Sequence, residues 1–427
     1  MVTKFTNAYV LTMDKGTCYQ NGCVVTDGSA IVHVGASVPA QYAGAKEVDC
    51  KGDILMPGLV NAHAHLGMSL FRCIAEGQSV QEWLTETIFP REERLTYEDV
   101  LNGTMLSLME CARGGVTTVA DTYFFNEASF EAAKASGMRT VLLGADMDIK
   151  KSTADVLKKV KQDIDRYNGK EANITCLPGA HSVYTCSERL LAGVADIAAA
   201  NRLPAYIHLS ETLKEVGDCT QVHGDLTPPQ YLHKMGYFAY GGIAAHCVHT
   251  DKDDIALLEQ SGVSAVHCPA SNLKLGSGIA PVYAMTERGL NVALGTDSSA
   301  SNNALDMFRE MYLASVLQKG VMNKAEAIPP KLALEMATVN GAKALSLGNT
   351  GMLKTGYCAD IIRVSAKEPH FYPQSDKEST LVYAAKSSDV VMTMSGGKVL
   401  YENGKYYLGF VPNFVIGYCK KFTKNIK

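Results

Sequence analysis

The sequence lacks a long hydrophobic run, a strong excess of charge and an N-terminal segment of the secretory type. No apolar stretch approaches the roughly 18–20 residues that a membrane-spanning helix needs, so we expect no membrane partner. The net charge is only −4, and nothing in it favours nucleic acid or an anionic membrane surface as a partner. Residues 1–7 show no basic segment followed by an apolar core, and we therefore expect a cytoplasmic protein.

The sequence also lacks Cys-x-x-Cys pairs, although it contains 12 cysteines. This absence argues against a structural zinc knuckle. Without a secretory signal, we expect free thiols in a reducing compartment rather than disulfides. Cys247 and Cys268 fall inside apolar runs that are typical of strands, and we predict that both are small buried core residues.

The hydrophobic pattern divides the chain into two β-rich ends and a long middle. At the ends, segments rich in β-branched residues predict strands at 8–12, 23–26, 30–34, 360–364, 390–394 and 398–401. Because the termini of a domain often lie close together, we expect the two ends to meet. In the middle, apolar segments predict eight strands at 55–61, 116–121, 140–145, 174–180, 205–208, 243–246, 264–267 and 292–296. Helical segments alternate with them, which predicts a parallel (β/α)₈ barrel.

The predicted barrel strands end in residues that bind metals, at the end of the barrel where chemistry is found. On a strand, residues i and i+2 point to the same face, so the imidazoles of His63 and His65 should lie together. Other predicted strands lead into His181, His208, His246 and Asp297. Imidazole and carboxylate are the ligands of catalytic divalent metals. Chance alone is a poor explanation for the placement of all six residues at the same end of one barrel.

The residues near these strand ends add chemistry to the predicted metal site. Glu211 follows His208 by three residues, within reach of a metal-bound group, which favours a general acid/base role over a surface charge. Asp297 can contact the metal and also accept a proton. The segment 174–180 contains neither lysine nor glutamate, the residues that usually bridge two metals in such barrels. We therefore predict one divalent metal, zinc in preference to iron or manganese.

These motifs resemble those of the amidohydrolase superfamily, in its purine deaminase and chlorohydrolase branch. Within the branch, the chain is most similar to 5′-methylthioadenosine/S-adenosylhomocysteine deaminases. The resemblance is carried by 57–65 (PGLVNAHAH), 179–187 (GAHSVYTCS), 208–212 (HLSET), 245–249 (AHCVH), 272–281 (NLKLGSGIAP) and 295–297 (GTD). It implies a TIM barrel over residues 56–349 and a small β-sandwich domain built from residues 1–55 and 350–427. It also implies hydrolytic deamination of an aminated purine or nucleoside, by attack of metal-bound hydroxide with release of ammonia.

The resemblance also assigns roles to single residues. The metal would be held by His63, His65, His208 and Asp297. Glu211 would carry a proton to the ring nitrogen of the substrate, and His246 would orient the hydrolytic water, with Asp297 helping to take its proton. His181 and Glu92 would contact the substrate near the ribose, although the adjacent Glu93 leaves the register open by one residue.

One departure from the family pattern bears on the substrate. The S-adenosylhomocysteine deaminases carry two arginines after the third strand, which bind the amino-acid carboxylate. This chain has no arginine between Arg139 and Arg166, and lysine is a poor replacement at a bidentate carboxylate site. Asp146 and Asp148 would repel a carboxylate. We therefore expect a neutral substrate, such as adenosine or methylthioadenosine, rather than S-adenosylhomocysteine.

Alternatives stay open at this point. Guanine, another aminated heterocycle or an s-triazine would use nearly the same metal site. A non-catalytic metal-binding scaffold is an alternative of a different class, but a structural site would close its fourth position, and Glu211 and His246 argue against it. We expect Trp83 to serve packing rather than binding. Homo-oligomers are frequent in the family, although no segment of this sequence indicates one.

Overall fold

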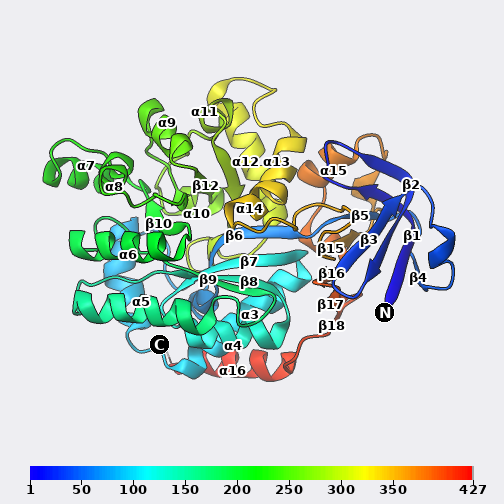
Figure 1. Ribbon diagram of the computed structural model, residues 1–427, viewed down its shortest axis with the longest axis horizontal. Helices are drawn as coiled ribbons and strands as arrows, with labels where there is room; N and C mark the ends of the chain where they lie inside the picture. Colours follow the sequence, from blue (N-terminus) through cyan, green and yellow to red (C-terminus); the bar gives the residue numbers. More distant parts are fainter. Residues whose placement is uncertain (426–427) are drawn as a thin grey trace.

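A computed structural model describes residues 1–425 and contains a ring of eight parallel strands covered by helices (Figure 1). The barrel strands are β6 (Leu59–His65), β7 (Val116–Tyr123), β8 (Arg139–Gly144), β9 (Ile174–Leu177), β10 (Ala205–Leu209), β11 (Gly242–His246), β12 (Val263–His267) and β13 (Asn291–Leu294). The longer helices between them are α3 (Tyr97–Arg113), α4 (Asn126–Ser136), α5 (Thr153–Tyr167), α6 (Glu188–Asn201), α7 (Leu213–Val222) and α9 (Lys252–Gln260), with α12 (Met307–Met322) after β13. The predicted (β/α)₈ barrel is confirmed.

Short contacts close the ring where the regular strand pairing is interrupted. Between β9 and β10, Gly179 forms a parallel bridge with Tyr206. Between β13 and β6, the short strand β14 (Asp297–Ser298) pairs in parallel with the end of β6. A Cβ atom on Gly295 would stand 2.9 Å from the backbone nitrogen of His63. Only glycine therefore allows the chain after β13 to approach β6 this closely.

The first predicted barrel strand differs from the structure. The segment 55–61 is divided between β5 (Ile54–Pro57) and β6, with Gly58 at the break. Strand β5 belongs to another sheet, where it pairs with β1 (Val2–Leu11) and β15 (Ile361–Val364). The prediction of one continuous strand was wrong because both halves are fully buried, so the apolar run continues across the change of sheet.

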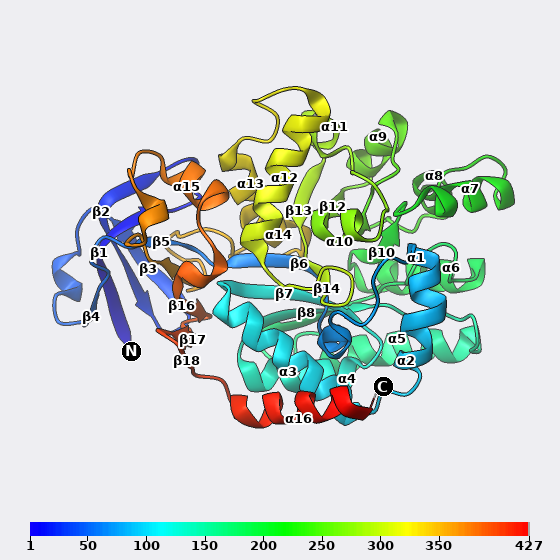
Figure 2. The same cartoon turned by 180° about the vertical axis from the view of Figure 1, so that it is seen from behind.

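Strands from both ends of the chain form a second, nine-stranded sheet beside the barrel (Figure 2). Its further members are β2 (Cys18–Asp27), β3 (Ala30–Gly35), β4 (Lys46–Asp49), β16 (Val390–Ser395), β17 (Lys398–Glu402) and β18 (Lys405–Tyr406). The two ends of the chain therefore meet, as predicted. Hydrogen bonding runs through all nine strands as one sheet, yet Ile31 of β3 and Met392 of β16 share a buried cluster. The sheet therefore buries side chains from strands near its opposite edges in a common core.

The C-terminal helix α16 (Pro412–Asn425) leaves this sheet and lies along α3 of the barrel (Figure 2). The hydroxyl of Tyr418 donates a hydrogen bond to the carboxylate of Asp99 at 2.8 Å. The last part of the segment predicted for the β-sandwich therefore covers the barrel instead. The division into domains at 1–55 with 350–427 and at 56–349 stays a prediction.

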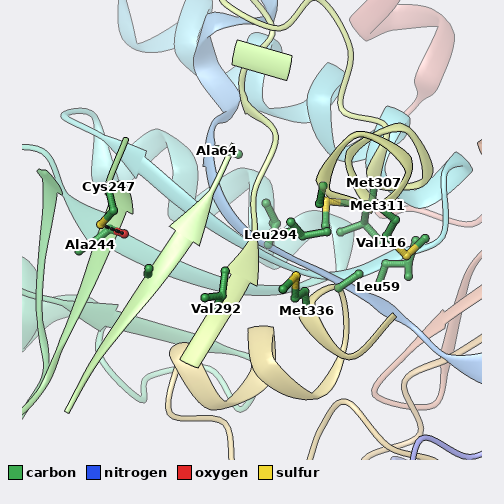
Figure 3. Close-up of a cluster of buried hydrophobic side chains, with 14 of the residues drawn as sticks. Leu59, Ala64, Val116, Ala244, Cys247, Val292, Leu294, Met307, Met311 and Met336 are labelled. Atoms are coloured by element: carbon green, nitrogen blue, oxygen red, sulfur yellow. Dashed lines mark hydrogen bonds between the residues drawn. The ribbon is translucent and has the colours of Figure 1, made fainter. Parts of the chain in front are cut away.

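A core of aliphatic side chains and methionines lies between the barrel strands and the outer helices (Figure 3). Leu59, Leu294 and Met311 are each at most 1% exposed. Cys247 belongs to this cluster, and Cys268 belongs to the cluster that fills the barrel interior. Both thiols are fully buried, which confirms the prediction that they are core residues.

Within residues 1–425, no helix combines the length and the hydrophobicity that would be needed to cross a bilayer. A cytoplasmic location, the lack of a nucleic-acid partner and assembly into a homo-oligomer stay predictions from the sequence.

Candidate active site

Imidazoles and one carboxylate from four different strands converge at the carboxyl end of the barrel. The residues are His63 and His65 of β6, His208 of β10, His246 of β11 and Asp297 of β14. Asp297 Oδ1 lies 3.4 Å from His63 Nε2 and 3.3 Å from His65 Nε2. The Nε2 atoms of His65 and His208 are 3.3 Å apart. The structure thus brings together residues that are far apart in the sequence.

Each imidazole uses its Nδ1 atom for a contact outside the cluster. His65 Nδ1 lies 2.5 Å from the carbonyl of Thr122, and His208 Nδ1 lies 2.7 Å from the carbonyl of His181. A carbonyl only accepts, so both Nδ1 atoms carry a proton, and in the neutral imidazole each Nε2 atom then presents a lone pair to the centre. This pattern is typical of metal-ligating histidines.

The charge states of the buried residues also fit a metal. His63 Nε2 is buried without a hydrogen-bond partner, a costly arrangement unless something binds there. Burial lowers the pKa of His63 to about 4 and that of His208 well below its usual range, so both are neutral, as ligands must be. Burial raises the pKa of Asp297, but His63 and His65 outweigh it and hold that pKa well below its usual range. For His65, burial lowers the pKa, but the adjacent Asp297 carboxylate raises it above its usual range. Two neutral imidazoles beside a His65–Asp297 pair fit a divalent ion that takes the place of the His65 proton.

Asp297 is held by three further contacts that sequence reasoning missed. The hydroxyls of Ser271 and Ser301 donate to its Oδ2 at 2.5 and 3.0 Å. Its Oδ1 accepts from the backbone N–H of Ser298 at 2.7 Å. Asp297 itself has a φ of 59°, a left-handed conformation that costs free energy for a residue with a side chain. The serines help to offset this cost and fix the carboxylate in place.

Glu211 lies beside His246 at the edge of the cluster. Its Oε1 is 4.0 Å from His246 Nδ1 and accepts a hydrogen bond from the Ser277 hydroxyl at 3.2 Å. Burial raises the pKa of Glu211. The carboxylate of Glu215 accepts the backbone N–H groups of Ser210 and Glu211 at 2.9 and 2.8 Å. A carboxyl that is held this firmly and has a raised pKa is suited to transfer a proton in catalysis.

The cavity above the cluster is covered by a short helical segment of the chain. It consists of α1 (Val80–Glu82), the π-helical turn η3 (Trp83–Ile88) and α2 (Phe89–Glu92). Trp83 is 6% exposed and lines the cavity. It therefore packs, as expected, and also forms part of the wall.

The structure distinguishes the two candidate glutamates on this segment. Glu92 lines the cavity, and its Oε1 accepts the Tyr123 hydroxyl at 2.9 Å. Burial raises the pKa of Glu92 to about 7. Glu93 instead forms an exposed ion pair with Lys150 at 2.8 Å. His181 also lines the cavity, beside the metal-binding cluster.

A second cavity of about 360 Å³ adjoins the first and shares part of its wall. Shared residues are Phe89, Glu92, Phe124, Ala145 and Met147. The rest is lined by Glu93, Leu95, Phe125, Asp146, Ile149, Lys150 and Lys151. The lining is predominantly apolar, and at least two of its acidic groups are paired, Glu93 with Lys150 and Asp146 with Lys159 at 3.2 Å.

A barrel with three histidines and an aspartate at its carboxyl end is the framework of a metal-dependent hydrolase. The chain belongs to the amidohydrolase family, whose model matches residues 54–400. It is 41% identical to a 5′-deoxyadenosine deaminase of Methanosarcina mazei over 93% of this chain and 92% of that protein. It is also 41% identical to a 5-methylthioadenosine/S-adenosylhomocysteine deaminase of Pelotomaculum thermopropionicum, over 92% of each.

A solved structure supports the same relationship. The crystal structure of an adenosine deaminase from Xanthomonas campestris with bound zinc superposes with a TM-score of 0.94. The two chains are 30% identical, and the match covers 99% of this chain and 98% of the other.

Proposed function

We propose that the protein is a metal-dependent deaminase of adenine nucleosides, with adenosine, 5′-deoxyadenosine and 5′-methylthioadenosine as candidate substrates. The observation that carries the proposal is Glu211, a buried carboxyl beside His246 and the metal-binding cluster. A structural metal site would need no such group. The names of the related proteins supply the substrate class.

We infer that one divalent ion binds to His63, His65, His208 and Asp297, and that the ion is zinc in preference to iron or manganese. The inference is supported by the unpartnered Nε2 of His63 and by the zinc in the related adenosine deaminase. When bound, such an ion lowers the pKa of a water molecule toward about 7, which provides a nucleophile at neutral pH.

The proton transfers are assigned to this chain's own residues. His246 and Asp297 orient the attacking water and accept its proton. Glu211 donates a proton to the ring nitrogen next to the carbon that carries the amino group, so that negative charge does not accumulate on the ring. The carbon–nitrogen bond then breaks as the proton taken up by His246 and Asp297 passes to the departing amino group, and the hydroxyl left on the ring carbon returns a proton to Glu211. One water is consumed, ammonia leaves and the ring keeps a carbonyl group.

Substrate contacts are assigned to the two connected cavities. Glu92 and His181 face the first cavity, where the Glu92 carboxylate could accept hydrogen bonds from ribose hydroxyls. The second cavity would take the 5′ substituent. Its apolar walls suit a methyl or methylthio group, and Lys150 and Lys159 are already paired with acidic side chains. We therefore infer poor use of S-adenosylhomocysteine, because its carboxylate would lose water and would meet no arginine among the residues lining this cavity, where the Lys151 ammonium is a poorer partner for it.

The test is a panel of substrates assayed for ammonia with zinc-loaded protein. Adenosine, 5′-deoxyadenosine and methylthioadenosine should each be deaminated, with a kcat/KM at least about tenfold above that of S-adenosylhomocysteine. Guanine and a chlorotriazine test the alternative heterocycles. Glu211→Gln should lower kcat by about 10²-fold or more, whereas Glu259→Gln, at an exposed position of α9, should not. Wild-type turnover by Glu211→Gln would refute the proton transfer, and no turnover of any nucleoside would refute the proposed activity.

A further inference from the structure

Asn272 contacts a residue of the proposed acid–base pair through its side chain. It lies on α10 (Pro269–Lys274) and is fully buried. Its Oδ1 lies 2.8 Å from Nδ1 of His246, which is itself 2% exposed. An amide oxygen can only accept, so the contact requires the proton of neutral His246 to sit on Nδ1. His65 and His208 direct Nδ1 to main-chain carbonyls in the same way.

The main chain of Asn272 reaches the second member of the pair. Its carbonyl accepts the backbone N–H of Ser277 at 2.8 Å. The hydroxyl of Ser277 donates to Glu211 Oε1 at 3.2 Å. The carbonyl of Ser277 is in turn 2.7 Å from Nε2 of His249. Asn272 thus connects the imidazole of His246 at the end of β11 and the carboxyl of Glu211 in the loop after β10.

We propose that Asn272 is the positioning residue for His246 and Glu211. Its amide oxygen selects the tautomer of His246 in which Nε2 carries a lone pair, and its carbonyl anchors the serine that holds Glu211. This role rests on the proposed function, because the two residues need fixed positions only if they move protons. A histidine with its proton on Nε2 could not accept the proton of the attacking water at that atom. Loss of the correct tautomer is known to be costly in other histidine-dependent sites.

Two substitutions of similar size separate positioning from packing. Asn272→Leu keeps the shape but removes the acceptor, and kcat should fall about 10²–10⁴-fold with KM changed less than about threefold. Asn272→Asp keeps an oxygen opposite Nδ1, and it should retain at least about a tenth of wild-type kcat. If Asn272 served only packing, Asn272→Asp should have the lower kcat of the two variants, since a buried carboxylate is the more disruptive change. A kcat for Asn272→Asp at or below that of Asn272→Leu would overturn the proposal.

A matched control and a metal assay complete the comparison. Asn102 is a buried amide on α3, where its side chain donates to the carbonyl of Glu98. Asn102→Leu should keep wild-type kcat, and both Asn272 variants should keep stoichiometric zinc. A metal loss that accounts for the fall in kcat of Asn272→Leu would refute a positioning role.

A spectroscopic measurement tests the tautomer without any substrate. In ¹⁵N-histidine-labelled, zinc-loaded protein, long-range ¹H–¹⁵N correlations report which ring nitrogen carries the proton, and His246→Gln identifies the signals. Wild-type His246 should show its proton on Nδ1, and Asn272→Leu should shift the proton toward Nε2. A wild-type signal with the proton on Nε2 would overturn the proposal even if both variants failed to fold. Because this readout needs no turnover, its failure is distinguishable from failure of the proposed deaminase activity.

Discussion

Replacing Glu215 with glutamine should change the stability of the protein in a pH-dependent way. Glu215 lies on α7, is 2% exposed and accepts two backbone N–H groups, those of Ser210 and Glu211. Burial is the largest of the effects that raise its pKa from an ordinary 4.5 to about 7. The folded protein therefore binds the Glu215 proton more tightly than the unfolded chain does. The stabilisation from that proton is complete below about pH 4.5 and is lost as the pH rises through about 7.

The size of the effect follows from the pKa difference. Each pKa unit corresponds to about 1.4 kcal/mol, so ionisation of Glu215 costs the folded state about 3 kcal/mol at alkaline pH. Glutamine does not ionise and avoids this cost. The single side-chain oxygen of glutamine can accept only one of the two N–H groups, however. This loss lowers the free energy of unfolding by about 1–3 kcal/mol at every pH. The variant should therefore be less stable than wild type at pH 5 and about as stable, or more so, at pH 8.5.

The assay is urea denaturation of zinc-loaded wild type and Glu215→Gln at pH 5 and pH 8.5. The difference in unfolding free energy between the two proteins should shift by about 2–3 kcal/mol in favour of the variant at the higher pH. Any pH dependence of metal binding is shared by both proteins and cancels. As a control, Glu259→Gln at an exposed position of α9 should change stability by less than about 0.5 kcal/mol at either pH. A difference that is equal at both pH values would refute the reasoning.

Two further predictions concern the candidate site. At a pH above the Glu92 pKa of about 7, Glu92→Gln should raise KM for adenosine about tenfold or more and leave kcat within about threefold, because a charged acceptor for the ribose is lost. Steady-state kinetics test this, and a lower kcat at unchanged KM would contradict it. His208→Ala should lower bound zinc well below one ion per chain, since three ligands would remain around the ion. Metal analysis after gel filtration tests this, and full occupancy would contradict the ligand set.

The strand ends and their metal-binding residues could be predicted from the sequence because the pattern that indicates each of them is local. Buried parallel strands appear as short apolar runs, and the ligands follow them directly in the chain. His63 and His65 illustrate this, since their spacing alone predicts that they share a face. Asp297 follows the last apolar run in the same way. Once the barrel is inferred, all of these ends lie on one side without further information.

The contacts that support these residues could not be predicted in the same way. Ser271 reaches the carboxylate of Asp297 from α10 and Ser301 reaches it from the turn after β14, and serine is common in such segments. Asn272 and Ser277 fall within a segment that matches the family pattern, but the sequence gives no indication of which side chain they contact. Such pairings depend on how non-adjacent loops fold over the barrel. No periodic pattern encodes them.

The sequence favoured Glu92 over Glu93 but left the register open by one residue, for a different reason. The covering segment is built from α1, η3 and α2, which are short turns with a π-helical turn in the middle. A π-helical turn changes the number of residues per turn, so a regular helical period cannot assign faces across it. The structure directs Glu92 to Tyr123 and Glu93 to Lys150. Packing of this segment over the cavity therefore sets the register.

The missing arginines and the charges of the second cavity lead to the same substrate preference. From the sequence alone, the lysines after β8 could still have replaced the arginines that bind a carboxylate. In the structure, Lys150 is paired with Glu93, and Lys159 is paired with both Asp146 and Asp163. An incoming carboxylate would have to compete with acidic groups of the protein for Lys150 and Lys159. Lys151 also lines the cavity, but it would offer a point charge without the bidentate contact of an arginine. A neutral 5′ substituent needs no such exchange and gains apolar contact with Phe89, Met147 and Ile149. Selectivity for neutral nucleosides would therefore depend on how these charges are paired within the chain, and the lack of arginine is only one part of it.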